Sequence, residues 1–262
     1  MNLGLENKPV IVMASGSGIG EGVALEFARE NAKVMLFDKS KENLEEASSK
    51  ILALTQNRVE YFVGDITRKQ DIENMVSKTN DIYGSIYALF NNTGGPPAGT
   101  FDTFDDQAWH DAFELTLLSY IRSIRAVLPI MRKAGVGRIV NNTSSSTKRV
   151  IDHLILSNTF RTGIMGLTKS LSRELGPDNI LINIVGPGKI ATERVNHLDS
   201  LKAENEGIAL EEFQRKSAKT IPLGRYGSTE EIAKLVVFLC SQANTYITGQ
   251  NILVDGGMVQ TY

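Results

Sequence analysis

The sequence predicts an α/β fold, namely a single doubly wound Rossmann-type domain in which about seven parallel strands are flanked by helices on both faces. Short β-branched, apolar runs alternate with longer segments of helical periodicity along the chain. These short runs are apolar throughout, as expected for strands buried on both faces of a parallel sheet. Neither a proline-rich linker nor an internal repeat divides the sequence. Residues 1–262 are therefore expected to form one domain.

The predicted elements alternate in order along the chain. The strand segments are 9–14, 33–38, 59–65, 85–91, 137–143, 179–185 and 250–257. The helical segments are 18–31, 41–55, 66–81, 105–133, 156–175 and 228–242. Asn31 suits the left-handed position that ends a helix. Residues 193–222 form a charged, helix-prone insertion before the last strand, and we expect a helical lid there because ligands bind beyond the carboxyl ends of such strands. A pair of solvated helices is the alternative.

The composition disfavours several classes of partner. The net charge is −2 and the charged residues are scattered, so no basic face for nucleic acid is predicted. No apolar run approaches the roughly 18 residues of a membrane span, and the N-terminal residues do not resemble a secretion signal. We therefore expect a soluble, cytoplasmic protein with no nucleic-acid or membrane partner. The only cysteine, Cys240, lies in an apolar run, which predicts a buried side chain and no Cys-rich metal site.

The first predicted strand runs into a glycine-rich turn at 14–22 (ASGSGIGEG). Glycines at a strand-to-helix turn let the backbone approach a pyrophosphate, and the helix N-terminus supplies free N–H groups. The spacing is neither G-x-G-x-x-G nor a P-loop, so a purely structural turn is the alternative. Asp38 ends the second strand, where a carboxylate can accept hydrogen bonds from an adenosine ribose or cap the next helix. NAD is therefore predicted, and the neighbouring Lys39 and Lys41 leave NADP open.

Five segments, in order, resemble the short-chain dehydrogenase/reductase family over nearly the whole chain. The family's T-G-x-x-x-G-x-G is similar to residues 13–20 (MASGSGIG), with alanine in place of the first glycine. Residues 64–67 (GDIT), 91–94 (NNTG) and 183–192 (NIVGPGKIAT) are similar to further family motifs, and 221–257 resembles the family's C-terminal part. The likeness is strongest to 3-oxoacyl reductase-like and glucose-dehydrogenase-like members.

This resemblance implies a nicotinamide dinucleotide cofactor. It places Asp65 at the adenine, Asn92 to Gly94 along the ribose side, and Ile190 and Thr192 at the nicotinamide carboxamide. The predicted cofactor contacts are Ala14, Ser15, Gly16, Ser17, Gly18, Ile19, Gly20, Asp38, Asp65, Ile66, Asn92, Thr93, Gly94, Arg161, Pro187, Gly188, Ile190 and Thr192. A turn built from Asn, Gly and Pro is the alternative for residues 91–99. Relatives usually form tetramers through the two long helices, which implies a homo-oligomer, dimer or tetramer.

The catalytic positions implied by the resemblance depart from the family pattern. The family uses Asn, Ser, Tyr and Lys. Ser144 matches the serine, but Thr116, Ser157 and Arg161 stand where the other three belong. A serine hydroxyl is a far weaker acid than a phenol, so the standard proton relay is absent. Arg161 keeps the positive charge, and a spacing of four residues puts it on the same helix face as Ser157.

Two functions are consistent with this degenerate motif. The first is an oxidoreductase that transfers a hydride between NAD(P) and a small carbonyl or alcohol substrate. In it Ser144 polarises the carbonyl, Arg161 holds the ribose, and His153 or water moves the proton, because histidine titrates near neutrality. His153 also suits a plain surface position, and Lys148 and Arg149 suit either an anion subsite or solvent. The second function is a catalytically silent relative that binds a dinucleotide and acts through assembly or ligand sensing.

Overall fold

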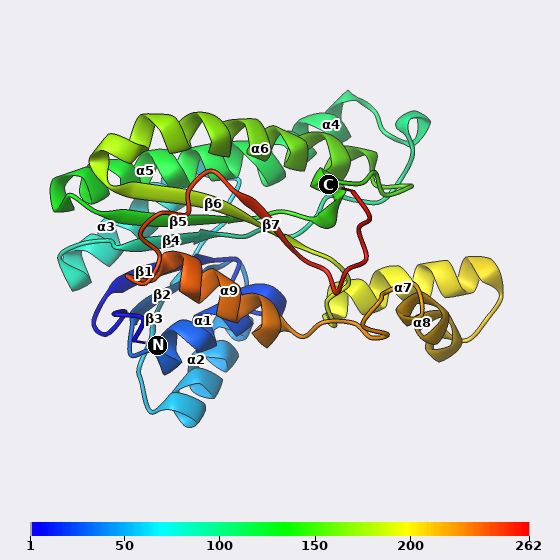
Figure 1. Cartoon of the computed structure of the whole chain (residues 1–262), viewed down its shortest axis with the longest axis horizontal. Coiled ribbons are helices and arrows are strands. Elements are labelled where there is room, and N and C mark those ends of the chain that lie inside the picture. The colour runs from blue at the N-terminus through cyan, green and yellow to red at the C-terminus, as the bar shows by residue number, and fades with distance from the viewer. Residues whose placement is uncertain (1, 262) are drawn as a thin grey trace.

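The computed structural model describes residues 2–261, and a parallel sheet of seven strands forms their centre (Figure 1). The strand order is β3-β2-β1-β4-β5-β6-β7. The strands are β1 (Pro9–Met13), β2 (Lys33–Asp38), β3 (Glu60–Val63), β4 (Ala88–Asn91), β5 (Gly137–Asn142), β6 (Ile180–Pro187) and β7 (Asn251–Val254). Each strand falls in one predicted segment, apart from two residues at the end of β6. The predicted doubly wound α/β fold is confirmed.

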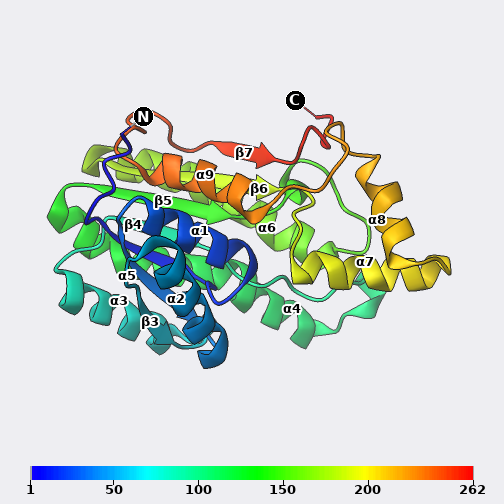
Figure 2. The same cartoon turned by 90° about the horizontal axis from the view of Figure 1, so that it is seen from below.

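Helices cover both faces of the sheet, as Figures 1 and 2 show. The helices α1 (Gly18–Arg29), α2 (Lys41–Thr55) and α9 (Thr229–Cys240) pack on one face. The helices α3 (Lys69–Tyr83), α5 (Ser119–Ala134) and α6 (Ile155–Leu175) pack on the other. In β1, Val10 and Val12 face the first layer whereas Ile11 and Met13 face the second. This alternation explains why the strand reads as continuously apolar.

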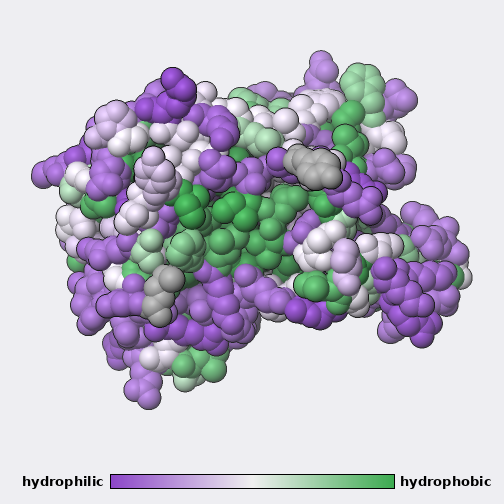
Figure 3. Space-filling model, viewed as in Figure 1, coloured by the Kyte–Doolittle hydropathy of each residue, from purple (hydrophilic) through white to green (hydrophobic). Residues whose placement is uncertain are grey.

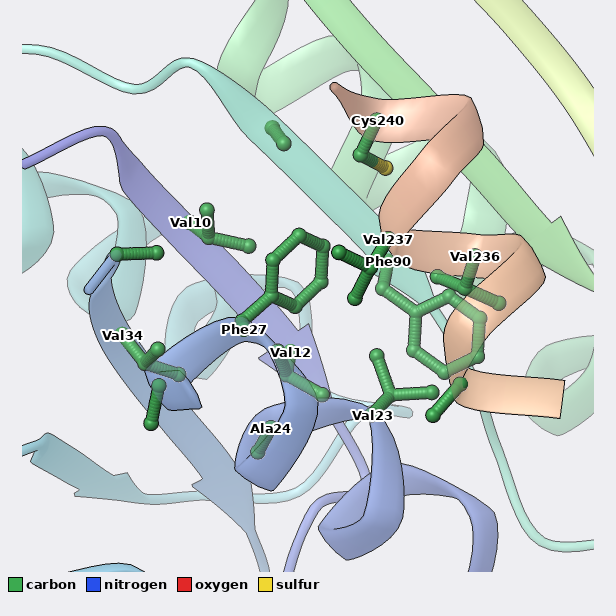
Figure 4. Close-up of a cluster of buried hydrophobic side chains, with 14 of the residues drawn as sticks. Val10, Val12, Val23, Ala24, Phe27, Val34, Phe90, Val236, Val237 and Cys240 are labelled. Carbon is green, nitrogen blue, oxygen red and sulfur yellow. The ribbon is translucent and has the colours of Figure 1, made fainter. Parts of the chain in front are cut away.

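The core under α1 and α9 is made mostly of valine and alanine side chains. Figure 4 shows Phe27 of α1 packed among Val10, Val12 and Val237, and Cys240 at the edge of the same cluster. Cys240 is fully buried, as its apolar sequence context predicted. Burial raises the pKa of its thiol to about 12, so it is an inert packing group in the folded protein.

The single predicted helix at 105–133 is wrong. The chain forms α4 (Asp106–Phe113), a π-helical segment (Glu114–Leu118) and then α5. A π segment adds a residue to a turn and rotates the following face, which apolar periodicity does not reveal. The predicted helix at 66–81 starts three residues late, at Lys69, because Asp65 accepts hydrogen bonds from the Thr67 backbone and hydroxyl and closes a turn. Asn31 has the expected left-handed conformation, with φ +58°.

The carboxyl edge of the sheet is where a ligand is expected. β1 lies between β2 and β4, so the connections that leave β1 and β4 turn to opposite sides and open a crevice. The predicted insertion forms α7 (Glu193–Glu206) and α8 (Leu210–Ala218), which project beyond this edge (Figure 1). Hydrophobic surface gathers over β7 and the adjoining part of α9 (Figure 3). Within residues 2–261, no helix has the length and apolar character to cross a membrane.

Candidate functional site

A cavity of about 1490 Å³ lies at the carboxyl edge, between the ends of the strands and α7. That volume exceeds the usual range for one drug-sized ligand and suits a dinucleotide with a second small molecule. The predicted site residues that line it are Ala14, Ser17, Gly18, Ile19, Asp38, Asp65, Ile66, Asn92, Thr93, Gly94, Ser144, His153, Ser157, Arg161, Pro187, Gly188, Ile190 and Thr192. Ser15, Gly16 and Gly20 are buried behind the cavity wall, and Thr116 does not reach it.

The glycine turn has the geometry of a backbone cradle. A Cβ on Gly20 would lie 2.0 Å from the Ala14 carbonyl oxygen, so only glycine permits this close approach. Gly18 has φ +59°, a left-handed conformation that glycine adopts without strain. The Ser17 side chain makes no capping hydrogen bond, which leaves N–H groups of the first turn of α1 free to bind an anion. These features fit a pyrophosphate.

Asp38 holds the glycine turn in place. Its Oδ2 accepts a hydrogen bond from the Gly16 N–H at 3.1 Å, and its Oδ1 accepts one from the Ser40 N–H at 3.1 Å. The alternative role of Asp38 as the cap of α2 is wrong, because Ser40 is that cap and accepts a hydrogen bond from the Asn43 N–H. A carboxylate has about four acceptor sites, so Asp38 retains capacity for ribose hydroxyls.

Asp65 lies further along the same wall of the cavity. Burial by itself raises the pKa of its carboxyl. The hydrogen bonds from Thr67 and the charges of Arg68 and Lys39 outweigh burial, and the pKa falls below the usual 3.8. Asp65 is therefore ionised at neutral pH and accepts hydrogen bonds only.

The segment after β4 is tied to two other strand ends. The Asn92 side-chain amide donates to the Ala14 carbonyl at 3.1 Å and accepts from the Asn142 amide at 2.8 Å. This chain of side chains fixes the glycine turn against β4 and β5. Thr93 is buried, and its hydroxyl finds no hydrogen-bond partner among the described residues. Because buried polar groups are normally paired, the Thr93 hydroxyl is suited to contact a bound ligand.

Ser144, two residues after the end of β5, and Ser157 of α6 both face the cavity. The Ser144 Oγ accepts a hydrogen bond from the Ser146 N–H at 3.0 Å, which leaves its own O–H free to donate to a substrate oxygen. Ser157 is buried at the start of α6. The predicted spacing of one helical turn holds, since Ser157 and Arg161 both line the same cavity.

Arg161 is buried, with only 6% of its surface exposed. Its Nη1 donates to the Asn142 carbonyl at 3.2 Å, and no carboxylate of residues 2–261 forms an ion pair with it. The Tyr120 hydroxyl donates to the same carbonyl at 2.6 Å. Burial raises the pKa of Tyr120 to about 12 although Arg161 lies beside it. Tyr120 is fully buried, so it does not replace the missing catalytic tyrosine.

The loop before α6 carries His153, whose side chain is exposed and lines the cavity. His153 has a left-handed backbone with φ +60°, and its carbonyl accepts a hydrogen bond from the Gly99 N–H at 2.7 Å. Lys148 and Arg149 are exposed, and of these two only Arg149 lines the cavity.

Sequence reasoning missed three cations of the cavity, Lys189, Arg194 and Lys202. The Lys189 ammonium donates to Asp199 Oδ1 at 3.2 Å, to the Tyr226 hydroxyl at 3.2 Å and to the Ser217 hydroxyl. The Arg194 Nη2 donates to the Pro96 carbonyl at 3.0 Å. Arg194 stands two residues after a recognised motif, but within a charged helix its charge alone indicates solvent exposure. The contact of Arg194 with the loop at 92–99 could not be predicted from the sequence.

The comparisons with known proteins agree with this fold. A family model described as enoyl-(acyl carrier protein) reductase matches residues 13–259. A 3-oxoacyl-[acyl-carrier-protein] reductase of Chlamydia muridarum is 34% identical, over 98% of this chain and 100% of the relative. The NADPH-dependent reductase BacG of Bacillus subtilis is 28% identical, over 98% of this chain and 100% of the relative.

Among solved structures, L-sorbose reductase of Gluconobacter frateurii, complexed with NADPH and L-sorbose, superposes with a TM-score of 0.95. It is 29% identical, and the match covers 100% of both chains. The family model spans nearly the whole sequence, and the relatives match it over their full length. The chain therefore belongs to the short-chain dehydrogenase/reductase family.

Proposed function

We propose that the protein is an oxidoreductase that transfers a hydride between a nicotinamide dinucleotide and the carbon of a carbonyl or alcohol substrate. One observation carries this proposal: a single cavity joins the glycine turn and Asp38 to Ser144, Ser157 and Arg161. The named relatives, two reductases and an NADPH-dependent reductase, support the same reaction class. A bound nicotinamide would supply or accept the hydride.

The residues of the chain would perform the remaining steps. The turn at 14–20 would hold the pyrophosphate, Asp38 the adenosine ribose and Asp65 the adenine, with 92–94 and 187–192 along the nicotinamide half. The Ser144 O–H would donate to the substrate oxygen and polarise the carbonyl. Arg161 would hold the ribose of the cofactor and would place a positive charge next to Ser157. When the carbonyl carbon gains the hydride, its oxygen must gain a proton, and we assign that transfer to His153 or to water in the open cavity.

The proposed cofactor is NAD, because the Asp38 carboxylate would repel a 2′-phosphate. Two of the similar proteins are described with NADPH. A preference of this protein for NADH over NADPH would therefore test the role assigned to Asp38. Binding of NADH and NADPH to the full-length protein can be followed by fluorescence titration. We expect NADH to bind more tightly and Asp38→Ala to reduce that preference. A preference unchanged by Asp38→Ala would rule out this assignment.

Turnover tests the reaction itself. Initial rates with NADH and NADPH would be measured across alcohols, sugars, keto esters and keto acids, for the wild type and for His153→Ala. We expect turnover, and a lower rate for His153→Ala unless water carries the proton. Cofactor binding without turnover of any substrate would instead favour a silent, dinucleotide-binding relative.

We further propose a cytoplasmic homo-oligomer, dimer or tetramer. Aromatic side chains on α4 and α6 support it, because Trp109 and Phe113 pack against Phe160 next to the exposed Phe101. Light scattering after size-exclusion chromatography would measure the mass of the assembly, and a monomer at micromolar concentration would contradict this proposal.

A further inference from the structure

Two guanidinium groups line the cavity, that of Arg161 from α6 and that of Arg194 from α7. Neither forms an ion pair with a carboxylate of residues 2–261. Each donates to one backbone carbonyl, Arg161 to Asn142 and Arg194 to Pro96. Arg161 is buried whereas Arg194 is exposed, and a buried cation such as Arg161 is costly unless an anion compensates it. The described chain supplies no such anion at this point.

Arg194 is held in its position by the local structure. A Cβ on Gly95 would lie 2.2 Å from the Arg194 Nη2 and 2.6 Å from its Cζ, so the guanidinium packs flat against the backbone that glycine leaves open. Its hydrogen bond to Pro96 spans from α7 to the loop after β4. These two contacts hold the Arg194 guanidinium at the wall of the cavity, although the residue as a whole is exposed.

The electrostatic surroundings of Arg194 are positive. It lies in the first turn of α7, after the N-cap Thr192, where the helix dipole disfavours a cation and favours an anion. Burial lowers the pKa of its guanidinium, and the charge of Arg161 lowers it further. Three positive features thus converge: the N-terminus of α7, Arg194 and Arg161.

The acidic residues nearby leave this charge uncompensated. Asp199 of α7 is buried, but Lys189 donates to its Oδ1 and Tyr226 to its Oδ2. Glu193 is exposed and makes neither a hydrogen bond nor an ion pair with Arg161 or Arg194. Asp152 and Glu206 also line the cavity, and neither forms an ion pair with Arg161 or Arg194, so the site has room for an anion from a bound molecule.

We propose that the substrate carries an anionic group, a carboxylate or a phosphate, that binds between Arg194 and Arg161 while its carbonyl meets Ser144. A guanidinium presents a planar fork that suits either anion. All three side chains line one cavity, so one small molecule can contact them together. This inference rests on the proposed oxidoreductase function. It selects keto acids or phosphorylated carbonyl compounds over neutral sugars and alcohols.

Matched substrate pairs test the charge requirement. Initial rates of the full-length protein with NADH would be compared for acetoacetate and methyl acetoacetate, and for dihydroxyacetone phosphate and dihydroxyacetone. We expect kcat/KM to favour one anion over its neutral partner by roughly 10–100-fold, as for a charge-assisted hydrogen bond. The pair with the larger ratio identifies the anion as carboxylate or phosphate. Equal rates within both pairs would overturn the inference and leave the oxidoreductase function intact.

Variants assign the preference to residues. Arg194→Met should lower kcat/KM for the anionic substrate and so remove the anion preference. Arg215→Met is the matched control, because Arg215 is an exposed arginine of α8 outside the cavity; it should keep the full preference. If Arg149→Met rather than Arg194→Met removes the preference, the anion binds at the other loop and this assignment is wrong.

A binding measurement separates the substrate from the cofactor. Melting temperature would be measured against malonate and against inorganic phosphate, with and without saturating NADH. We expect saturable stabilisation that persists with NADH and is lost in Arg194→Met. Stabilisation that NADH abolishes, together with a tenfold weaker NADH affinity in Arg194→Met, would assign Arg194 to the pyrophosphate and overturn the inference. Failure of the wild type to bind either cofactor would refute the proposed function itself, separately from the anion site.

Discussion

Two cations lie in the same cavity and differ in their surroundings. The Lys189 ammonium donates hydrogen bonds to three side chains, those of Asp199, Ser217 and Tyr226. Arg161 is more deeply buried, yet a backbone carbonyl is the one hydrogen-bond acceptor found for its guanidinium among residues 2–261. The charge of Lys189 is compensated by a carboxylate of the protein. The charge of Arg161 is compensated only when a ligand binds.

The difference separates structural charges from functional ones. The partners of Lys189 come from α7, α8 and the segment before α9, so this cluster fastens both helices of the predicted lid to the 183–192 motif. Buried ion pairs with complete hydrogen bonding fix geometry. A buried charge without a counter-ion instead marks a site whose charge is needed for something outside the chain.

The largest effect is expected from restoring the family's catalytic pair. Ser157→Tyr combined with Arg161→Lys places a phenol next to a cation in the cavity, and the cation lowers the phenol pKa. With a positioned acid, kcat for a neutral carbonyl substrate should rise by roughly 100-fold or more. Steady-state kinetics of the double variant, with each single variant as control, would measure this. An unchanged kcat would mean that Arg161 is not positioned as the family's lysine is.

Asp199→Ala tests whether the Lys189 cluster stabilises the fold. It leaves the Lys189 charge without its anion and the Tyr226 hydroxyl without its acceptor. Removing one partner of a buried pair typically costs several kcal/mol, and because the Lys189 side chain is 25% exposed we expect a loss of about 2–3 kcal/mol in the free energy of unfolding. Urea denaturation would measure it. Stability within about 0.5 kcal/mol of wild type would show that the cluster does not fasten the lid helices.

Arg161→Met should change stability in the opposite direction. The substitution removes a buried charge that has no anion and fills the space with an apolar side chain. The Asn142 carbonyl keeps a donor, since the Tyr120 hydroxyl lies at 2.6 Å. We expect the free energy of unfolding without ligand to be unchanged or to rise by about 1 kcal/mol, while activity falls. A clear loss of stability would mean that Arg161 is a structural charge, like Lys189.

Much of the fold could be predicted because its signals are local. Apolar runs and the turns after them indicated each strand, and Asn31 marked a helix end. The π segment at 114–118 could not be predicted, since one extra residue in a turn alters no composition. It carries Thr116 into the core with an unpartnered hydroxyl, at the position where the family has asparagine.

The site was predictable where side chains follow strand ends and unpredictable where distant segments meet. Asp38 ends β2 and Ser144 follows β5 by two residues, so their place at the carboxyl edge followed from the topology. Arg194 depends on a glycine about a hundred residues away, Gly95, that leaves room for its guanidinium. The same limit applies to Lys189, whose anion comes from α7. Long-range pairing of charges is a property of the folded chain that residue patterns do not encode.

The smallest expected effect is a pH dependence of the free energy of unfolding. It distinguishes the effect of burial on the Lys189 pKa from the effect of the Asp199 charge. Burial lowers the pKa of Lys189 below 10.5, against the attraction of Asp199, while Lys202 lowers it further. Between this lowered value and 10.5 the unfolded chain binds more protons than the folded chain, so this group makes the free energy of unfolding rise with pH. The Tyr226 pKa is raised, so its opposing contribution begins only above its usual value of 10.0.

The measurement compares wild type with Lys189→Met by urea denaturation between about pH 8 and pH 10, which lies below the range where Tyr226 contributes. Contributions from groups outside the cluster, such as the Cys240 thiol with its raised pKa, cancel in the difference. We expect the stability of the wild type relative to Lys189→Met to increase modestly over this interval. A decrease would show that the attraction of Asp199 outweighs burial, and Lys189 would then be an even more fully compensated charge, widening its contrast with Arg161.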